Sequence, residues 1–196
     1  MMLRFVSLWV VISAMISIVH AGAFEDGMAA FEAREYQKAL TLWRTLAEQG
    51  DVASQINIGE MYAKGLGVTK NITEALMWFK KAAAQGSAKA EFSLGEIYAY
   101  GHGIPVDYEQ SGKWYRKAAE RGHAGAQYKL GVRYFKGEGV PIDYTMAYAW
   151  MDVASKQGHQ SSLKYRNMIA TVLDPDELRK AKVLAAQLLK KYGQAK

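Results

Sequence analysis

The chain has 196 residues, a formal net charge of +6 and no cysteine, which excludes disulfides, thiolate metal sites and a lipidated N-terminal cysteine. The charge is uneven, because residues 22–162 carry sixteen basic and sixteen acidic side chains, whereas residues 163–196 carry eight basic and three acidic ones. A nucleic-acid-binding protein would carry a basic stripe along its body, so this distribution argues against a nucleic-acid partner.

Residues 1–21 are predicted to be a secretory signal peptide that is removed on export. Arg4 supplies a positive charge, and residues 5–19 are apolar apart from serines but too short to span a bilayer comfortably. The sequences Val19-His20-Ala21 and Ala21-Gly22-Ala23 both offer a cleavage site between small residues. We therefore expect a periplasmic or secreted protein, and an uncleaved N-terminal anchor is the alternative.

A period of 36 residues runs through residues 53–161. The residues that recur in phase are Gly59, Gly95 and Gly131; Tyr62, Tyr98 and Tyr134; Gly65, Gly101 and Gly137; Gly67, Gly103 and Gly139; Trp78, Trp114 and Trp150; and Gly86, Gly122 and Gly158. A fixed period of this size is typical of stacked supersecondary units rather than of a single wound domain.

Each period predicts two helices. In the middle unit the first helix runs from about Ala90 to Tyr100, because Ala90, Leu94 and Ile97 fall on one helical face. Gly95 is unfavourable inside a helix, so its recurrence indicates that another helix approaches closely there. Gly101 ends the helix, since a residue without Cβ can adopt the left-handed conformation.

The second helix of each unit follows a short glycine-containing loop. Its N-cap is predicted to be Asn71, Asp107 or Asp143, and Glu74 and Gln110 are predicted to complete capping boxes. The recurring tryptophan is expected to be buried and to tie neighbouring helices together, and the alanine-rich last turn allows close packing.

The pattern A-x3-L-G-x2-Y-x2-G-x-G-[VI]-x2-D-x3-A-x2-W-[YF]-[RK]-K-A-A-x2-G resembles the Sel1-like repeat, a relative of the tetratricopeptide repeat. Three units match over residues 53–161, and the third departs from the pattern at Met151-Asp152-Val153. The resemblance implies an all-α, right-handed solenoid of stacked antiparallel helix pairs. It also implies a non-enzymatic scaffold or adaptor that binds a protein partner in the cell envelope and needs no cofactor.

Two helix pairs are predicted to flank the three repeats. Residues 22–52 resemble a half-matching first unit with a loop four residues shorter, closer to a tetratricopeptide unit. Residues 162–196 are predicted to form a capping pair, with a helix from Leu163 to Val172 and another that begins at Asp174-Pro175. The last helix has an apolar face (Leu178, Ala181, Leu184, Ala185, Leu188, Tyr192) and a basic face (Arg179, Lys180, Lys182, Lys190, Lys191). Capping of the solenoid is the favoured interpretation, and a membrane-surface helix is the alternative.

The partner is predicted to bind the first helices, which line the concave face in tetratricopeptide-like solenoids. The predicted binding residues are Ile56, Glu60, Lys64, Lys89, Phe92, Glu96, Tyr100, Tyr128, Val132, Phe135 and Lys136. Phe92, Tyr100, Tyr128 and Phe135 would form an aromatic stripe with a charged rim, as interfaces favour. The alternative is that these aromatic side chains only pack onto the adjoining unit.

Several motifs resemble catalytic or metal sites but are not assigned to them. The GxG loops follow a helix rather than a strand, so they are not nucleotide-binding fingerprints. His123 and His159 occupy the same position in successive units, which favours a structural role over metal binding. Ser161-x-x-Lys164 matches the nucleophile motif of penicillin-recognising enzymes, but the partner motifs S-D-N and K-T-G are absent. No catalytic, cofactor or metal residue is predicted, and an enzyme acting on β-lactam or cell-wall substrates is the alternative function.

Overall fold

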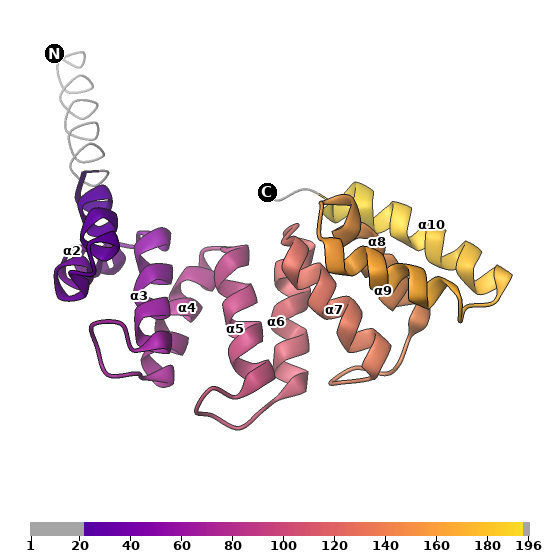
Figure 1. Ribbon diagram of the computed structural model, residues 1–196, viewed down its shortest axis with the longest axis horizontal. Coiled ribbons are helices and arrows are strands. Elements are labelled where there is room, and N and C mark those ends of the chain that lie inside the picture. The colour runs from indigo at the N-terminus through magenta and orange to yellow at the C-terminus, as the bar shows by residue number, and fades with distance from the viewer. Residues whose placement is uncertain (1–21, 194–196) are drawn as a thin grey trace, which may run out of the picture. The chain divides into compact units, whose positions relative to one another are not determined.

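The computed structural model describes residues 22–193, so the signal peptide predicted at residues 1–21 lies outside the described residues. The chain forms two compact units, Met1–Ala82 and Ala83–Lys196, and each is described by itself. Every element assigned within residues 22–193 is a helix (Figure 1).

The first unit begins with a helix over residues 22–32, followed by α2 (Tyr36–Glu48), α3 (Val52–Lys64) and most of α4 (Ile72–Ala84). Its core is built around Trp43, which is 1% exposed. A Cβ added to Gly27 would overlap the Trp43 indole, so the helix over residues 22–32 can approach α2 only because position 27 is glycine. The same relation holds between Gly59 and the ring of Phe79.

The second unit contains six helices that follow one another with short connections. They are α5 (Ala88–Tyr100), α6 (Tyr108–Glu120), α7 (Ala124–Lys136), α8 (Tyr144–Lys156), α9 (Gln160–Ala170) and α10 (Pro175–Tyr192). The helices α5 and α6 pack as one pair and α7 and α8 as the next, while α7 also packs on α6 and α9 on α8 (Figure 1). The helix predicted from Leu163 begins earlier, at Gln160.

The recurring helix glycines confirm the expected close approach of a second helix. A Cβ placed on Gly95 would lie 2.5 Å from Cδ1 of Tyr115, and one on Gly131 would lie 3.1 Å from Cε of Met151. Tyr115 and Met151 are fully buried and directly follow the recurring tryptophan. The residue after the tryptophan is therefore the one that fills the groove above the glycine.

The predicted N-caps are confirmed, but the predicted capping boxes of the repeats are not. The Asp107 side chain accepts from the backbone N–H of Gln110 at 2.9 Å. The backbone N–H of Asp107, which Gln110 would need for a capping box, donates instead to the carbonyl of Tyr98. The N–H of Asn71 likewise donates to the carbonyl of Tyr62, so the boxes predicted at Gln110 and Glu74 are wrong. Gly101 does end α5 with a positive φ of 76°.

The recurring tryptophans are not equally buried, which corrects the expectation for the central unit. Trp150 is 2% exposed, whereas Trp114 is only half-buried and has the Lys117 ammonium 4.4 Å from its ring centroid. The difference comes from α10, which packs along α8 and stacks Tyr192 on Trp150 with ring centroids 5.9 Å apart. Trp114 has no equivalent cover within the described part of the chain.

All three residues at which the third repeat departs from the pattern, Met151-Asp152-Val153, are buried. Val153 is fully buried, whereas its counterpart in the preceding unit, Lys117, is exposed. Asp152 is buried and forms ion pairs with Arg166 of α9 at 2.9 Å and with Lys156 at 2.8 Å. The departure thus replaces an exposed lysine position with a buried valine and provides a charged contact with α9.

Candidate protein-binding surface

The predicted binding residues of the first unit lie on α3 and differ in exposure. Ile56 is 6% exposed and belongs to the core, so its side chain offers little surface to a partner. Glu60 is half-buried and forms an ion pair with the exposed Lys64 at 3.1 Å. The first unit therefore presents a charged pair here rather than an apolar anchor.

In the second unit most of the predicted aromatic stripe packs onto neighbouring elements. Phe92 stacks on His123 with centroids 4.5 Å apart, and Tyr128 stacks on His159 at the same distance. Phe135 meets Tyr165 of α9 edge-on at 6.4 Å. These three side chains are half-buried, as the packing alternative requires. Binding of a partner by them stays a prediction.

Tyr100 is the aromatic residue that remains open, with 55% of its surface exposed. Lys129 of α7 donates to the Tyr100 hydroxyl at 2.8 Å, and its ammonium lies 4.9 Å from the ring centroid. The other predicted residues are Val132, which is half-buried against the core, and the exposed side chains of Lys89 and Lys136.

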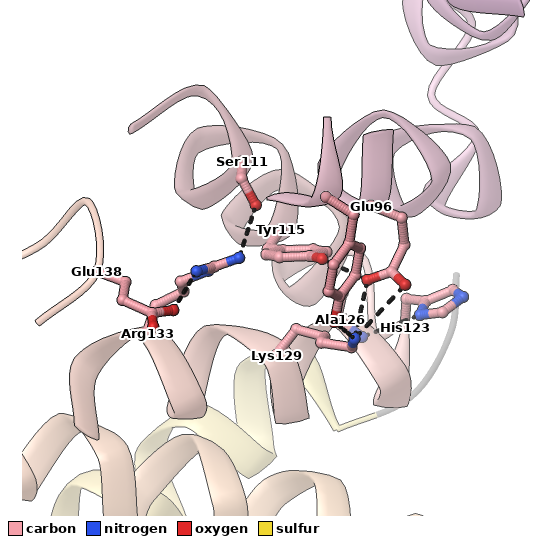
Figure 2. Close-up of polar contacts among 9 residues, drawn as sticks. Glu96, Ser111, Tyr115, His123, Ala126, Lys129, Arg133 and Glu138 are labelled. Atoms are coloured by element: carbon pink, nitrogen blue, oxygen red, sulfur yellow. Dashed lines mark hydrogen bonds and ion pairs between the residues drawn. The ribbon is translucent and has the colours of Figure 1, made fainter. Parts of the chain in front are cut away.

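Glu96, Tyr100, Tyr115 and Lys129 form one polar cluster, here called the Glu96 cluster. Figure 2 shows the Glu96 carboxylate between the Tyr115 hydroxyl, which donates to it, and the Lys129 ammonium, 3.1 Å away. Because α5, α6 and α7 each contribute a residue, the cluster holds two successive repeats in register.

Two members of this cluster, Tyr115 and Lys129, have raised pKa values. Burial, followed by the hydrogen bond to Glu96, raises the pKa of Tyr115, so its hydroxyl stays protonated. Burial lowers the pKa of Lys129, but the hydrogen bond to Tyr100 and the Glu96 carboxylate together outweigh burial and raise it. A tyrosine and a lysine with raised pKa values stay protonated at neutral pH, so both act here as hydrogen-bond donors rather than as nucleophiles or bases.

The prediction missed Lys129, Tyr115 and Arg133. Arg133 is 6% exposed, pairs with Glu138, and lies 3.4 Å from the Ser111 hydroxyl, as Figure 2 shows. Its counterparts in the other repeats, Met61 and Ile97, are apolar. Arg133 could therefore have been found from the sequence, because it is a charged residue at a repeat position that is otherwise apolar.

The structure also locates the residues that resembled catalytic or metal-binding motifs in the sequence. The Nδ1 atom of His123 accepts from the backbone N–H of Ala126 at 3.1 Å and caps α7 (Figure 2). Burial lowers the pKa of His123. Ser161 and Lys164 are both exposed on α9. Within residues 22–193 no group of three or more histidine or acidic residues could hold a metal ion, and no helix is long and apolar enough to cross a membrane.

Comparison with protein-family models finds one family that matches most of the chain. The model of the Sel1 repeat matches residues 24–51, 52–87, 88–123 and 124–159, so it also counts the short first unit as a repeat. The chain belongs to the Sel1 repeat family. Sel1 repeats generally mediate protein–protein interaction.

Solved structures agree with the assignment to an all-α Sel1 solenoid. A Sel1 repeat protein from Oxalobacter formigenes is 35% identical, with a TM-score of 0.72 over 84% of this chain and 70% of that one. The protein c5321, a protective antigen of uropathogenic Escherichia coli, is 31% identical, with a TM-score of 0.62 over 89% of this chain. The chain spans only 46% of the length of c5321. No curated protein matches.

Proposed function

We propose that this Sel1 repeat protein is an exported, non-enzymatic scaffold that binds a protein partner in the bacterial cell envelope through its first helices. The binding role follows from the general function of Sel1 repeats. Export rests on the charged start, short apolar run and small-residue cleavage sites of residues 1–21. The protective-antigen role of c5321 is a property of that protein, and it is compatible with an exposed location for a relative.

The observation that carries the binding proposal is the Glu96 cluster. Tyr100 is a large aromatic side chain held in one orientation by Lys129, so little side-chain entropy remains to be lost on binding. Aromatic residues surrounded by a polar rim are the usual energetic centres of protein interfaces. The partner would therefore place an apolar or aromatic group against the Tyr100 ring.

Two alternatives receive less support. An enzyme of the β-lactam type would need Ser161 in an enclosed site beside Lys164, but both side chains are exposed. A membrane-surface role for α10 would need a free apolar face. Ala181 and Ala185 are buried, and the rest of the predicted apolar face packs against the core of the second unit: Leu178, Leu184, Leu188 and Tyr192. Val183 of α10 is exposed.

Site-specific photo-crosslinking tests the proposal. A photoreactive residue at Tyr100 should capture a discrete partner from native envelopes, whereas the same residue at Lys113, an exposed position on α6, should not. Tyr100→Ala should weaken binding by about 2 kcal/mol, or roughly 30-fold, while the protein stays folded. Equal capture from both positions, or unchanged affinity of the folded variant, would contradict the proposed surface.

The export half of the proposal has its own test. Mass spectrometry of the natively expressed protein should find an N-terminus at Gly22 or Phe24. A membrane-bound protein that keeps Met1 or Met2 would instead support the anchor alternative.

A further inference from the structure

The helix α9 leaves open a face that its counterparts in the preceding repeats bury. In those repeats the second helix packs on the first, α6 on α5 and α8 on α7, whereas α10 follows α9 but packs along α8. The exposed residues of α9 recur at the spacing of a single helical face, and they are Gln160, Leu163, Lys164, Asn167 and Met168. The helix α9 therefore lacks the cover that a second helix gives to α5 and α7.

Comparison with the preceding repeat shows what this face does inside the array. Leu163 stands one period after Gln127, which is fully buried, yet 46% of the Leu163 surface is exposed. Asn167 stands one period after Gly131, the buried glycine on which the second helix packs, and Asn167 is exposed. Met168 is 43% exposed. A terminal repeat needs a polar outer face, whereas α9 presents two large apolar side chains.

The helix over residues 22–32 of the first unit also has an open face. Its exposed residues combine small with acidic side chains, and they are Gly22, Glu25, Asp26, Ala29, Glu32 and, directly after the helix, Ala33. Asp26 precedes the helix glycine Gly27, just as Leu94 precedes Gly95 in the middle repeat. Leu94 is fully buried and Asp26 is exposed, so the first helix is uncovered at a position that is buried inside the array.

A hollow of about 470 Å³ lies beside this face, between the helix over residues 22–32 and α2. The residues that line it are Asp26, Ala29, Ala30, Ala33, Glu35, Lys38 and Leu42. The three alanines leave room for a longer side chain, and Leu42 adds an apolar wall. Lys38 is paired with Glu35 at 3.1 Å, so the Asp26 carboxylate sets the charge of the hollow. The hollow is thus suited to a long apolar side chain with a basic neighbour.

The two open faces are complementary in size and in charge. The distance between packed helices depends on the side chains at the contact, so the long Leu163 and Met168 require small residues on the opposing helix. Ala29 and Ala33 are such residues. Residues 22–52 carry six acidic and three basic side chains, whereas residues 163–196 carry three acidic and eight basic ones. Opposite charge favours the encounter of the two faces, and like charge disfavours the pairing of either face with itself.

We propose that copies of this protein associate head to tail, with the open face of α9 in one copy packed on the helix over residues 22–32 of another. Leu163 and Met168 enter the alanine-lined hollow, and Lys164 faces the acidic side chains around it. Because the two surfaces differ, the interface is heterologous and can add further copies. The inference goes beyond the proposed function, and loss of partner binding at Tyr100 would leave it intact.

Sedimentation velocity of the purified protein tests the association. The average sedimentation coefficient of the wild type should rise with protein concentration, whereas L163E/M168E and A29R/A33R should each remain monomeric over the same range. All four positions are exposed, so both variants are expected to fold. V183E is the matched control, since Val183 is an exposed apolar residue of α10 outside the open face, and it should associate as the wild type does.

Mixing the two monomeric variants tests whether the contact joins different surfaces. L163E/M168E keeps an intact helix over residues 22–32, and A29R/A33R keeps an intact α9. An equimolar mixture should therefore form a dimer that does not grow further. A wild type that stays monomeric at every concentration, variants that associate as the wild type does, or a mixture that forms no dimer would each overturn the proposal.

Disulfide crosslinking locates the contact, because the chain has no cysteine of its own. A copy with Asn167→Cys and a copy with Ala33→Cys should form a mixed disulfide dimer under mild oxidation. A copy with Val183→Cys should not crosslink to Ala33→Cys. Equal crosslinking from both positions, or preferential crosslinking of Asn167→Cys to itself, would contradict a head-to-tail contact. A disulfide that forms within one chain of the double variant A33C/N167C would show instead that α9 is covered by its own copy.

Discussion

Two glycines in the middle of neighbouring helices should respond oppositely to replacement by alanine. Gly95 of α5 lies under Tyr115, so an added Cβ would be 2.5 Å from Cδ1 and 2.6 Å from Cε1 of that ring. Gly112 of α6 is also buried, but the nearest side-chain atom to an added Cβ is Cγ1 of Val140, at an ordinary 3.9 Å. Both residues lie inside helices, so their intrinsic helix propensities are matched.

The expected magnitudes follow from two terms. Alanine stabilises a helix interior by about 1 kcal/mol relative to glycine. Overpacking a buried site costs about 1–3 kcal/mol. The Tyr115 ring is fully buried and its hydroxyl is bonded to Glu96, so it cannot swing away and the cost lies at the upper end. We expect Gly112→Ala to gain about 1 kcal/mol and Gly95→Ala to lose about 2 kcal/mol.

Thermal unfolding followed by circular dichroism measures both variants. For a protein of this size 1 kcal/mol shifts the melting temperature by about 2–4 °C. Gly112→Ala should therefore melt about 2–4 °C above the wild type and Gly95→Ala about 4–8 °C below it. If Gly95→Ala were as stable as the wild type, the recurring glycines would not be explained by the close approach of a second helix.

Three further predictions concern the tryptophans, the histidine cap and the loop glycine. Trp150→Ala should lower the free energy of unfolding by about 3–5 kcal/mol, and Trp114→Ala by clearly less, because Trp150 is fully buried and Trp114 is not. Equal losses in urea unfolding would refute the conclusion that α10 buries Trp150. Burial lowers the pKa of His123, so the stabilisation that its neutral ring provides is complete above about pH 6.5 and falls as the pH drops below that value. The variant His123→Ser keeps a capping oxygen but does not titrate in this range. Between about pH 7.5 and pH 5.5 its melting temperature should therefore decrease less than that of the wild type. Gly101→Val should lower the melting temperature, because φ is +76° and an added Cβ would lie 2.6 Å from the carbonyl oxygen of Ile104; an unchanged melt would exclude strain at this position.

The sequence alone determined the features that depend on residues a few positions apart. The period, the presence of two helices in each repeat, and the caps at Asp107 and Asp143 follow from local hydrogen bonding and local apolar spacing, and the structure confirms them. Helix boundaries were less exact, since the helix predicted from Leu163 to Val172 runs from Gln160 to Ala170. The predicted capping box at Gln110 failed because the backbone N–H of Asp107 is bonded to Tyr98, in the preceding helix. A bond across the loop cannot be read from the three residues that define the box.

Burial and partnership were decided only by the tertiary structure. Trp114 and Trp150 occupy identical positions in the repeat, and one is covered because α10 returns across α8. The aromatic residues Phe92 and Tyr128 are half-buried, and a histidine from the start of the next repeat, His123 or His159, stacks on each ring. A repeat pattern gives equivalent residues the same local conformation, but their surroundings depend on which segments return from elsewhere in the chain.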